Sequence, residues 1–143
     1  RLPQSAFVAQ FIGGTNLLHG TLADAGELLT VETNSGVVRG KNGVNGMQPG
    51  AAVFCSIRPE SVRVKHAEVP SNPCDGTNAL MAEVLSIMYL GDSEEYSLRL
   101  ADGTIVRAVE YNPTARKAQV GDRLALEFDP QAVVVLPQED LSD

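Results

Sequence analysis

The sequence predicts an all-β protein built from two duplicated lobes, and three observations support this prediction. The segment at residues 50–65 recurs without a gap at residues 121–136. In both copies apolar residues alternate with other residues before and after a central proline, as in strands with one buried face. The hairpin signal at residues 34–36 also has a counterpart at residues 101–103, with the apolar residues in the same phase.

Each copy of the repeated segment is expected to form a strand, a sharp corner and a second strand. Pro59 and Pro130 align at the corner. A proline fixes its own φ and favours extended geometry in the residue before it, so the chain can turn without becoming helical. We expect the corner to be architectural and to close each lobe. Arg58 and Glu60 flank the corner in the first copy only, which makes them candidates for contacts with a partner.

The N-terminal stretch predicts a short amphipathic helix at residues 5–12, stopped by two glycines. Its apolar residues have one-and-four spacing: Phe7, Val8, Phe11 and Ile12. An isolated helix shorter than about 12 to 15 residues is marginal in water, so this one must dock on another surface. Because the chain begins at Arg1 with such a helix, we expect it to continue from a preceding domain.

The rest of the chain divides into two β lobes and a connector. We expect an N-terminal segment at 1–14, a first lobe at 15–65, a connector at 66–77, a second lobe at 78–137 and a tail at 138–143. The connector holds two prolines and no periodic pattern.

Strands are also expected before each corner, at residues 16–24, 27–33, 37–40, 80–90, 96–100 and 104–111. Asn112-Pro113 predicts one helical turn through Lys117.

Composition and charge exclude several classes of function. The formal net charge is −7, and the 11 basic residues do not cluster, which argues against nucleic acid and against an anionic membrane surface. The chain has no tryptophan and few other aromatic residues on which bases could stack. There is no apolar run of the roughly 18 residues that a spanning helix needs. Cys55 and Cys74 are too few for a disulfide framework, which fits a reducing compartment.

Motifs for catalysis, cofactors or metals are absent from the sequence. The loop at residues 36–42 is a near miss to a phosphate-binding loop, and a hairpin return explains it fully. His19 and His66 lack metal-ligand spacing, and no nucleophile motif accompanies them. Asp92, Glu94 and Glu95 could bind a cation, although a solvated acidic turn is the commoner arrangement. We therefore expect no catalytic residue, no cofactor and no metal in this chain.

Several segments, taken in order, resemble a known family. They are FVAQFIG at residues 7–13, NLL at 16–18, IRPE at 57–60, YLG at 89–91 and GD at 121–122. The chain is similar to the C-terminal accessory region of the ATP-binding subunits of bacterial ABC importers, most of all the spermidine/putrescine type. The resemblance implies a transport-associated OB-type (TOBE-like) β-barrel region of two intertwined lobes, following an ATPase domain.

The resemblance also implies a function. In that family the ATPase domains work as a pair and drive membrane-spanning subunits, while the C-terminal regions hold the pair together or receive regulatory signals. We therefore expect a non-catalytic regulatory and dimerisation domain at the cytoplasmic face of the membrane. Its expected partners are a second copy, the ATPase domain of its own polypeptide and, indirectly, the membrane subunits. ATP and magnesium would bind outside this chain.

A second hypothesis is a stand-alone barrel that binds a small ligand, either an oxyanion or a polyamine. The acidic balance of the chain favours a cation, and Asp92, Glu94 and Glu95 are then the expected contacts. An enzyme or an oligonucleotide-binding barrel is disfavoured by the missing motifs, the charge and the scarcity of aromatic residues.

Overall fold

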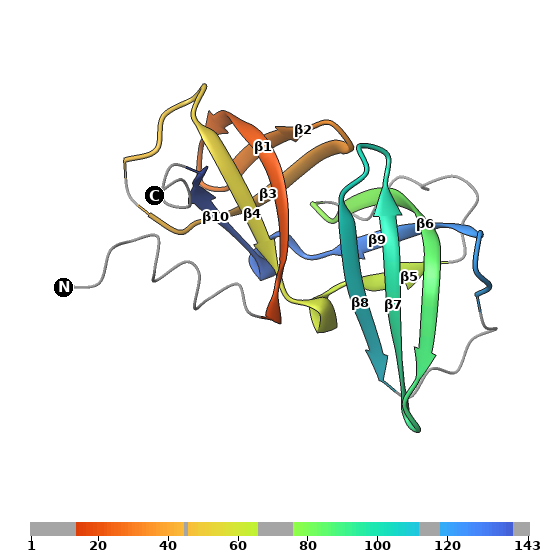
Figure 1. The fold of residues 1–143 in the computed structure, drawn as a ribbon. Helices are drawn as coiled ribbons and strands as arrows, with labels where there is room; N and C mark the ends of the chain where they lie inside the picture. Colours follow the sequence, from red (N-terminus) through yellow and green to blue (C-terminus); the bar gives the residue numbers. More distant parts are fainter. Residues whose placement is uncertain (1–13, 45, 66–75, 112–117, 139–143) are drawn as a thin grey trace.

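The computed structural model describes residues 14–44, 46–65, 76–111 and 118–138 of the chain. These residues form strands joined by tight turns, with a short 3-10 turn at each proline corner (Figure 1). The predicted all-β class is therefore confirmed. The helix expected at residues 5–12 and the helical turn expected at residues 112–117 lie outside the described residues.

The observed strands follow the expected ones closely in both halves of the sequence. The first half holds β1 (Asn16–Ala25), β2 (Leu29–Thr33), β3 (Gly36–Asn42), β4 (Ala52–Ile57), the 3-10 turn η2 (Pro59–Ser61) and β5 (Arg63–Lys65). The second half holds β6 (Asn78–Tyr89), β7 (Ser93–Leu100), β8 (Ile105–Tyr111), β9 (Arg123–Phe128), the 3-10 turn η3 (Pro130–Ala132) and β10 (Val133–Pro137).

The two halves exchange their last strands. One sheet is a closed barrel in the order β1-β2-β3-β10-β4, and the other has the order β5-β9-β6-β7-β8. Strand β5 thus pairs with β9 of the second half, and β10 pairs with β3 and β4 of the first. The predicted intertwined, OB-like architecture is confirmed. The sequence predicted that each corner would close its own lobe. In the structure, however, each corner carries the chain from one lobe into the other.

The two corners have nearly the same backbone. Arg58 (φ −72°, ψ 143°) and Asp129 (φ −72°, ψ 134°) are both extended, and a buried proline follows each. The glycines that open the two copies, Gly50 and Gly121, have φ of 94° and 96°, a region that glycine enters without steric cost. This agreement shows that the repeat seen in the sequence is a structural duplication.

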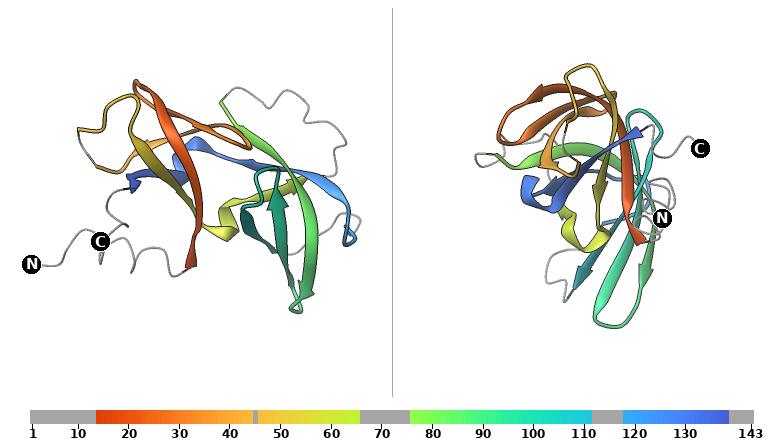
Figure 2. Two further views of the ribbon diagram at one scale, coloured as in Figure 1. Left: turned by 45° about the horizontal axis from the view of Figure 1, so that its top comes forward. Right: turned by 90° about the vertical axis from the view of Figure 1, so that its left-hand side faces the viewer.

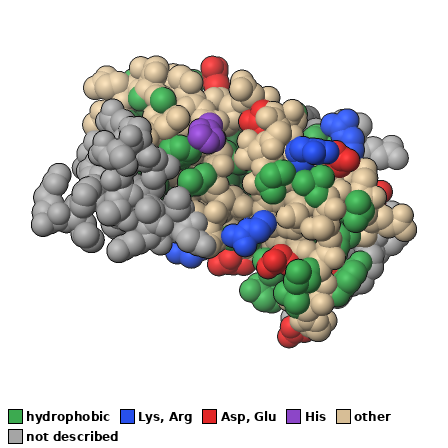
Figure 3. All heavy atoms as spheres, in the orientation of Figure 1, with side chains coloured by type: hydrophobic (Ala, Val, Ile, Leu, Met, Phe, Trp, Pro, Cys, Tyr) green, Lys and Arg blue, Asp and Glu red, His purple; other side chains and the backbone are tan. Residues whose placement is uncertain are grey.

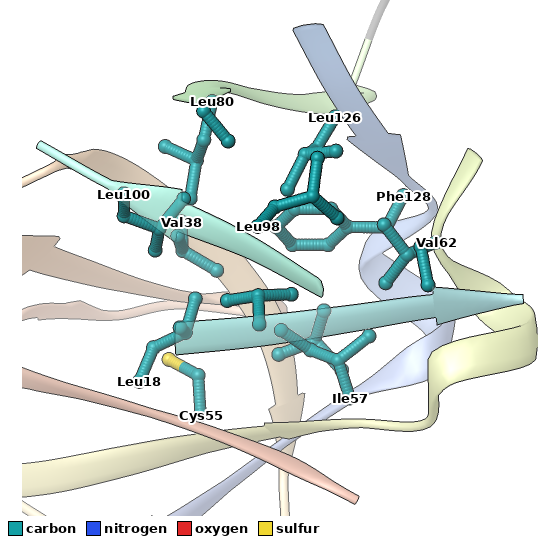
Figure 4. Packing of buried hydrophobic residues seen from close by; sticks show 14 of the residues in the cluster. Leu18, Val38, Cys55, Ile57, Val62, Leu80, Leu98, Leu100, Leu126 and Phe128 are labelled. Carbon is teal, nitrogen blue, oxygen red and sulfur yellow. The ribbon is translucent and has the colours of Figure 1, made fainter. Parts of the chain in front are cut away.

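One hydrophobic core runs through both lobes. Leu18, Val38, Cys55 and Ile57 from the first half meet Leu80, Leu98, Leu126 and Phe128 from the second in a single cluster of buried side chains (Figure 4). The views in Figure 2 show the strands that follow the corners running from one lobe into the other. Because they share a core and exchange strands, the lobes form one cooperative unit.

Two asparagines join the lobes in a reciprocal way. The side chain of Asn16 on β1 accepts from the backbone N–H of Arg107 (2.8 Å) and donates to its carbonyl oxygen (2.8 Å). Asn78 on β6 does the same with the backbone of Arg39 on β3 (2.8 and 2.9 Å). Both asparagines are buried. A side-chain amide carries the same donor and acceptor as a peptide group, so it can pair with both backbone groups of one residue.

We predict that Asn78→Ala destabilises the chain by roughly 2 to 4 kcal/mol, because it leaves the N–H and the carbonyl of Arg39 without their partners. Urea unfolding followed by circular dichroism would measure the loss. Asn42→Ala is the matched control, since its side chain accepts only from the exposed turn at Val44 and its replacement should cost far less. Equal losses in the two variants would contradict this account of the inter-lobe contact.

Candidate functional site

The two residues predicted to contact a partner lie at the first corner. Arg58 precedes η2 and Glu60 lies within it, and both are exposed, while Pro59 between them is buried. Turn η2 packs against β8 of the second lobe. The corner therefore presents both charged side chains at the junction of the lobes. Their role in binding a partner stays a prediction.

The three carboxylates predicted to contact a cation do not come together. Asp92 lies in the exposed turn between β6 and β7, whereas Glu94 and Glu95 belong to strand β7. Successive side chains on a strand point to opposite faces of the sheet. Glu94 is only 2% exposed, and Glu95 lies on the outer face. Only Glu94 is therefore placed in a buried polar environment.

Glu94 belongs to a row of polar side chains at the open end of the second lobe. Cross-strand pairing sets Tyr89 opposite Glu94, and Glu94 opposite Glu110. The hydroxyl of Tyr96, two residues along β7, donates to Glu94 Oε1 (2.8 Å). Residues opposite each other, or two apart on one strand, share a face of the sheet, so these four side chains surround one end of the lobe interior.

Glu110 also closes the second lobe. Its Oε2 accepts from the backbone N–H of Val64 on β5 (3.0 Å), where β5 approaches β8. At the corresponding place in the first lobe, β10 pairs with β3 through the backbone. A carboxylate side chain thus replaces strand pairing in the second lobe, and that sheet stays open between β8 and β5. At the rim of this gap Tyr89 is 58% exposed, whereas Glu94 and Tyr96 are buried behind it.

The electrostatics of this row favour a positive ligand. Burial, together with the hydrogen bond to Glu94 and its negative charge, raises the pKa of the Tyr96 phenol well above its usual range. Tyr96 is therefore a neutral hydrogen-bond donor at physiological pH. Within the part of the chain that the structure describes, no group of three His, Cys, Asp or Glu side chains could hold a metal ion. Carboxylates beside phenol rings are suited to binding an organic cation.

Other residues considered in the sequence have structural roles. His19 is exposed on β1, and its ring meets the edge of Phe54 with centroids 4.4 Å apart. Cys55 is a free, buried cysteine, and burial raises the pKa of its thiol to about 12. A thiol that stays protonated in the core is not a nucleophile. His66 and Cys74 lie outside the described residues.

Several of these contacts were missed by sequence reasoning, and simple signals could have found them. The tripeptide Gly-Thr-Asn occurs at residues 14–16 and again at 76–78, which marks the two asparagines that join the lobes. Glu110 and Tyr96 could have been found by continuing the alternation of β7 and β8 to the ends of the strands. Nothing in the alternation indicates that Tyr89 would lie beside them.

The fold and the site together define a class: a two-lobed OB-like β domain with exchanged strands and a shared core. The TOBE domain profile (TOBE_2) matches residues 55–136, which is more than half of the chain. The chain belongs to the TOBE domain family. In the described residues, no helix is long and apolar enough to cross a membrane.

Relatives of this chain include ATP-binding proteins of polyamine importers. The spermidine/putrescine import ATP-binding protein PotA of Rubrobacter xylanophilus is 36% identical over 141 residues, which is 94% of this chain and 35% of that protein. PotA 1 of Pseudomonas aeruginosa is 32% identical over 142 residues, again 94% of this chain and 35% of that protein. The chain spans about a third of the length of these relatives.

A solved structure shares the fold. The cytoplasmic molybdate-binding protein ModG, in a crystal form with molybdate bound, superimposes with a TM-score of 0.72. The match covers 85% of this chain and 95% of that one, with 14% sequence identity. The OB-like architecture expected from the sequence is thus also seen in a known structure.

We predict that Tyr96→Phe destabilises the chain by about 1.5 to 3 kcal/mol, because the Glu94 carboxylate loses the buried hydrogen bond that it accepts from the Tyr96 hydroxyl. Thermal or urea unfolding at neutral pH would measure the change. Tyr111→Phe is the control, since Tyr111 is 65% exposed and its hydroxyl should contribute little. A Tyr96→Phe variant as stable as Tyr111→Phe would show that the contact with Glu94 does not stabilise the fold.

Proposed function

We propose that this chain is the non-catalytic C-terminal regulatory and dimerisation domain of an ABC importer ATP-binding subunit of the polyamine type. The observation that carries the proposal is the 36% identity to a spermidine/putrescine import ATP-binding protein across 94% of the chain. ATP hydrolysis, with its magnesium, would belong to another part of the polypeptide. Imported polyamine would be bound mainly by other subunits.

Two features of the architecture are compatible with a structural role for the domain. The lobes share one core and exchange strands, so we expect the domain to move as one rigid body. Its proposed partners are a second copy, the ATPase domain of the same polypeptide and, through it, the membrane subunits. The proposed location is the cytoplasmic face of the plasma membrane.

We expect the purified chain to self-associate. Multi-angle light scattering over a concentration series should give a mass that rises from that of one chain toward that of two. A strict monomer at the highest concentration would remove the dimerisation half of the proposal.

Reading the coding sequence upstream of Arg1 tests whether the chain belongs to an importer ATP-binding subunit, because a phosphate-binding loop of the form G-x-x-x-x-G-K-[ST] is expected there.

A second candidate function is small-ligand binding by the domain itself. The polar row of Tyr89, Glu94, Tyr96 and Glu110 favours a polyamine, since it sets two carboxylates beside phenol rings at an open end of the second lobe. The fold shared with a molybdate-binding protein supports an oxyanion as the other ligand class. In either case the chain would act as a stand-alone small-ligand binding barrel.

Calorimetry with spermidine and with molybdate would test this second candidate. Spermidine is expected to bind, and Glu110→Gln is expected to weaken that binding because it removes one negative charge from the row. Glu32→Gln is the control, since it removes a charge of the same sign from an exposed position on β2 of the first lobe. The absence of heat with both ligands would remove this candidate and leave the first unaffected.

A further inference from the structure

The outer face of the β6–β7 hairpin is basic at one end. The guanidinium of Arg99 on β7 forms an ion pair with Glu83 on β6 (3.0 Å). Arg123 on β9 is set opposite Glu83 on its other side, so one carboxylate lies between two arginines. A hollow of about 350 Å³ opens here; its lining residues include Met81, Arg99, Leu100 and Arg123. This end therefore carries two arginines and one carboxylate around a mainly polar hollow.

The other end of the same hairpin is apolar and acidic. Met88 on β6 and Leu90 just after that strand are 56% and 50% exposed, and Tyr111 at the end of β8 is 65% exposed. Asp92 in the turn and Glu95 on the outer face lie beside them. Figure 3 shows hydrophobic and acidic side chains gathered at the lower tip of this lobe and basic side chains toward its upper end.

The fold itself does not require this apolar tip, as the first lobe demonstrates. Leu22 on β1 and Val84 on β6 are equivalent, because each exchanges backbone hydrogen bonds with the turn that precedes the next corner. Beyond these positions β1 ends at Ala25 and is followed by Gly26, whereas β6 continues to Tyr89. The first lobe therefore reaches the same architecture without exposed apolar side chains at its hairpin end. Clustered exposed apolar residues that folding does not need mark a binding surface.

We propose that the outer face of β6–β7 is the contact between two copies of this chain, which lie antiparallel across a twofold axis. The apolar and acidic tip of each copy would then cover the arginine-lined hollow of the other. This inference rests on the proposed dimerisation and names its surface. In a twofold contact the same patch is used on both copies, so a face with opposite character at its two ends is complementary to itself.

The middle of this face is compatible with close approach. Ser86 and Ser97 are paired across β6 and β7 between the two ends, and their small side chains leave the sheet surface low at that point. A twofold axis that crosses β7 between Glu95 and Tyr96, next to these serines, lies midway between Asp92 and Arg99 along the chain. It sets Asp92 of one copy opposite Arg99 of the other, with Arg123 nearby. Each copy contributes one tip and one hollow, so both are occupied and no end is left to extend a chain of copies.

Charge exchange between copies tests the proposal. Asp92→Arg and Arg123→Glu, each alone, should raise the dimer dissociation constant by at least about tenfold, because both contacts become like-charged. An equimolar mixture of the two variants should dimerise more strongly than either variant alone, since in the mixed dimer the introduced arginine faces the introduced glutamate and the unchanged Asp92 faces the unchanged Arg123. The dissociation constant should stay above that of the original chain, because the introduced arginine also lies near Arg99. Sedimentation velocity with one variant carrying a fluorescent label would measure all three constants.

The controls separate this surface from dimerisation in general. Val37→Ser removes an exposed apolar side chain of the first lobe and should leave the dissociation constant unchanged, whereas Leu90→Ser should raise it. If the chain dimerises but neither single charge variant weakens it, or if the mixture is no stronger than its components, the proposed surface is wrong while dimerisation stands. A chain that stays monomeric in every case would overturn both.

Discussion

The fold depends on the pairing of each lobe's first strand with the other lobe's hairpin through one buried asparagine side chain. Asn16 and Asn78 each satisfy both backbone groups of an arginine across the junction. Without that amide, a buried peptide group at the edge of the hairpin would lose its partners at substantial cost. The two lobes can exchange β5 and β10 only if they stay side by side, and these four hydrogen bonds hold them in that position.

A duplicated architecture makes the differences between the copies informative. The corners share a backbone, yet Arg58 and Glu60 of the first have Asp129 and Gln131 as their counterparts in the second. The second lobe alone has a carboxylate where strand pairing would close the barrel, and it alone has a hairpin with an apolar tip. Because both copies form the same architecture, a feature that only one copy has is not required for folding. Such features are the candidates for function.

Sequence patterns predicted the strands well and their partners poorly. The alternation of apolar residues indicates which face of a strand is buried, and a proline indicates where the chain turns. The order of the elements could therefore be predicted from the sequence. Neither signal identifies the neighbouring strand, so the exchange of β5 and β10 had to come from the structure or from a family resemblance. Glu94 was assigned to a solvated turn because it follows Gly91 and Asp92. In the structure Ser93 already begins β7, which places Glu94 inside.

The negative charge of the chain limits how copies of it can meet. With a net charge of −7, two copies repel each other at distances where their charges are felt as a whole. Salt screens this repulsion beyond about 8 Å at physiological ionic strength, so a contact between copies must depend on local charge complementarity at shorter range. Arginine pairs with carboxylates in a fixed planar geometry, which adds direction to such a contact. The outer face of β6–β7 supplies arginines, carboxylates and an apolar tip together, which is the combination that association of an acidic domain requires.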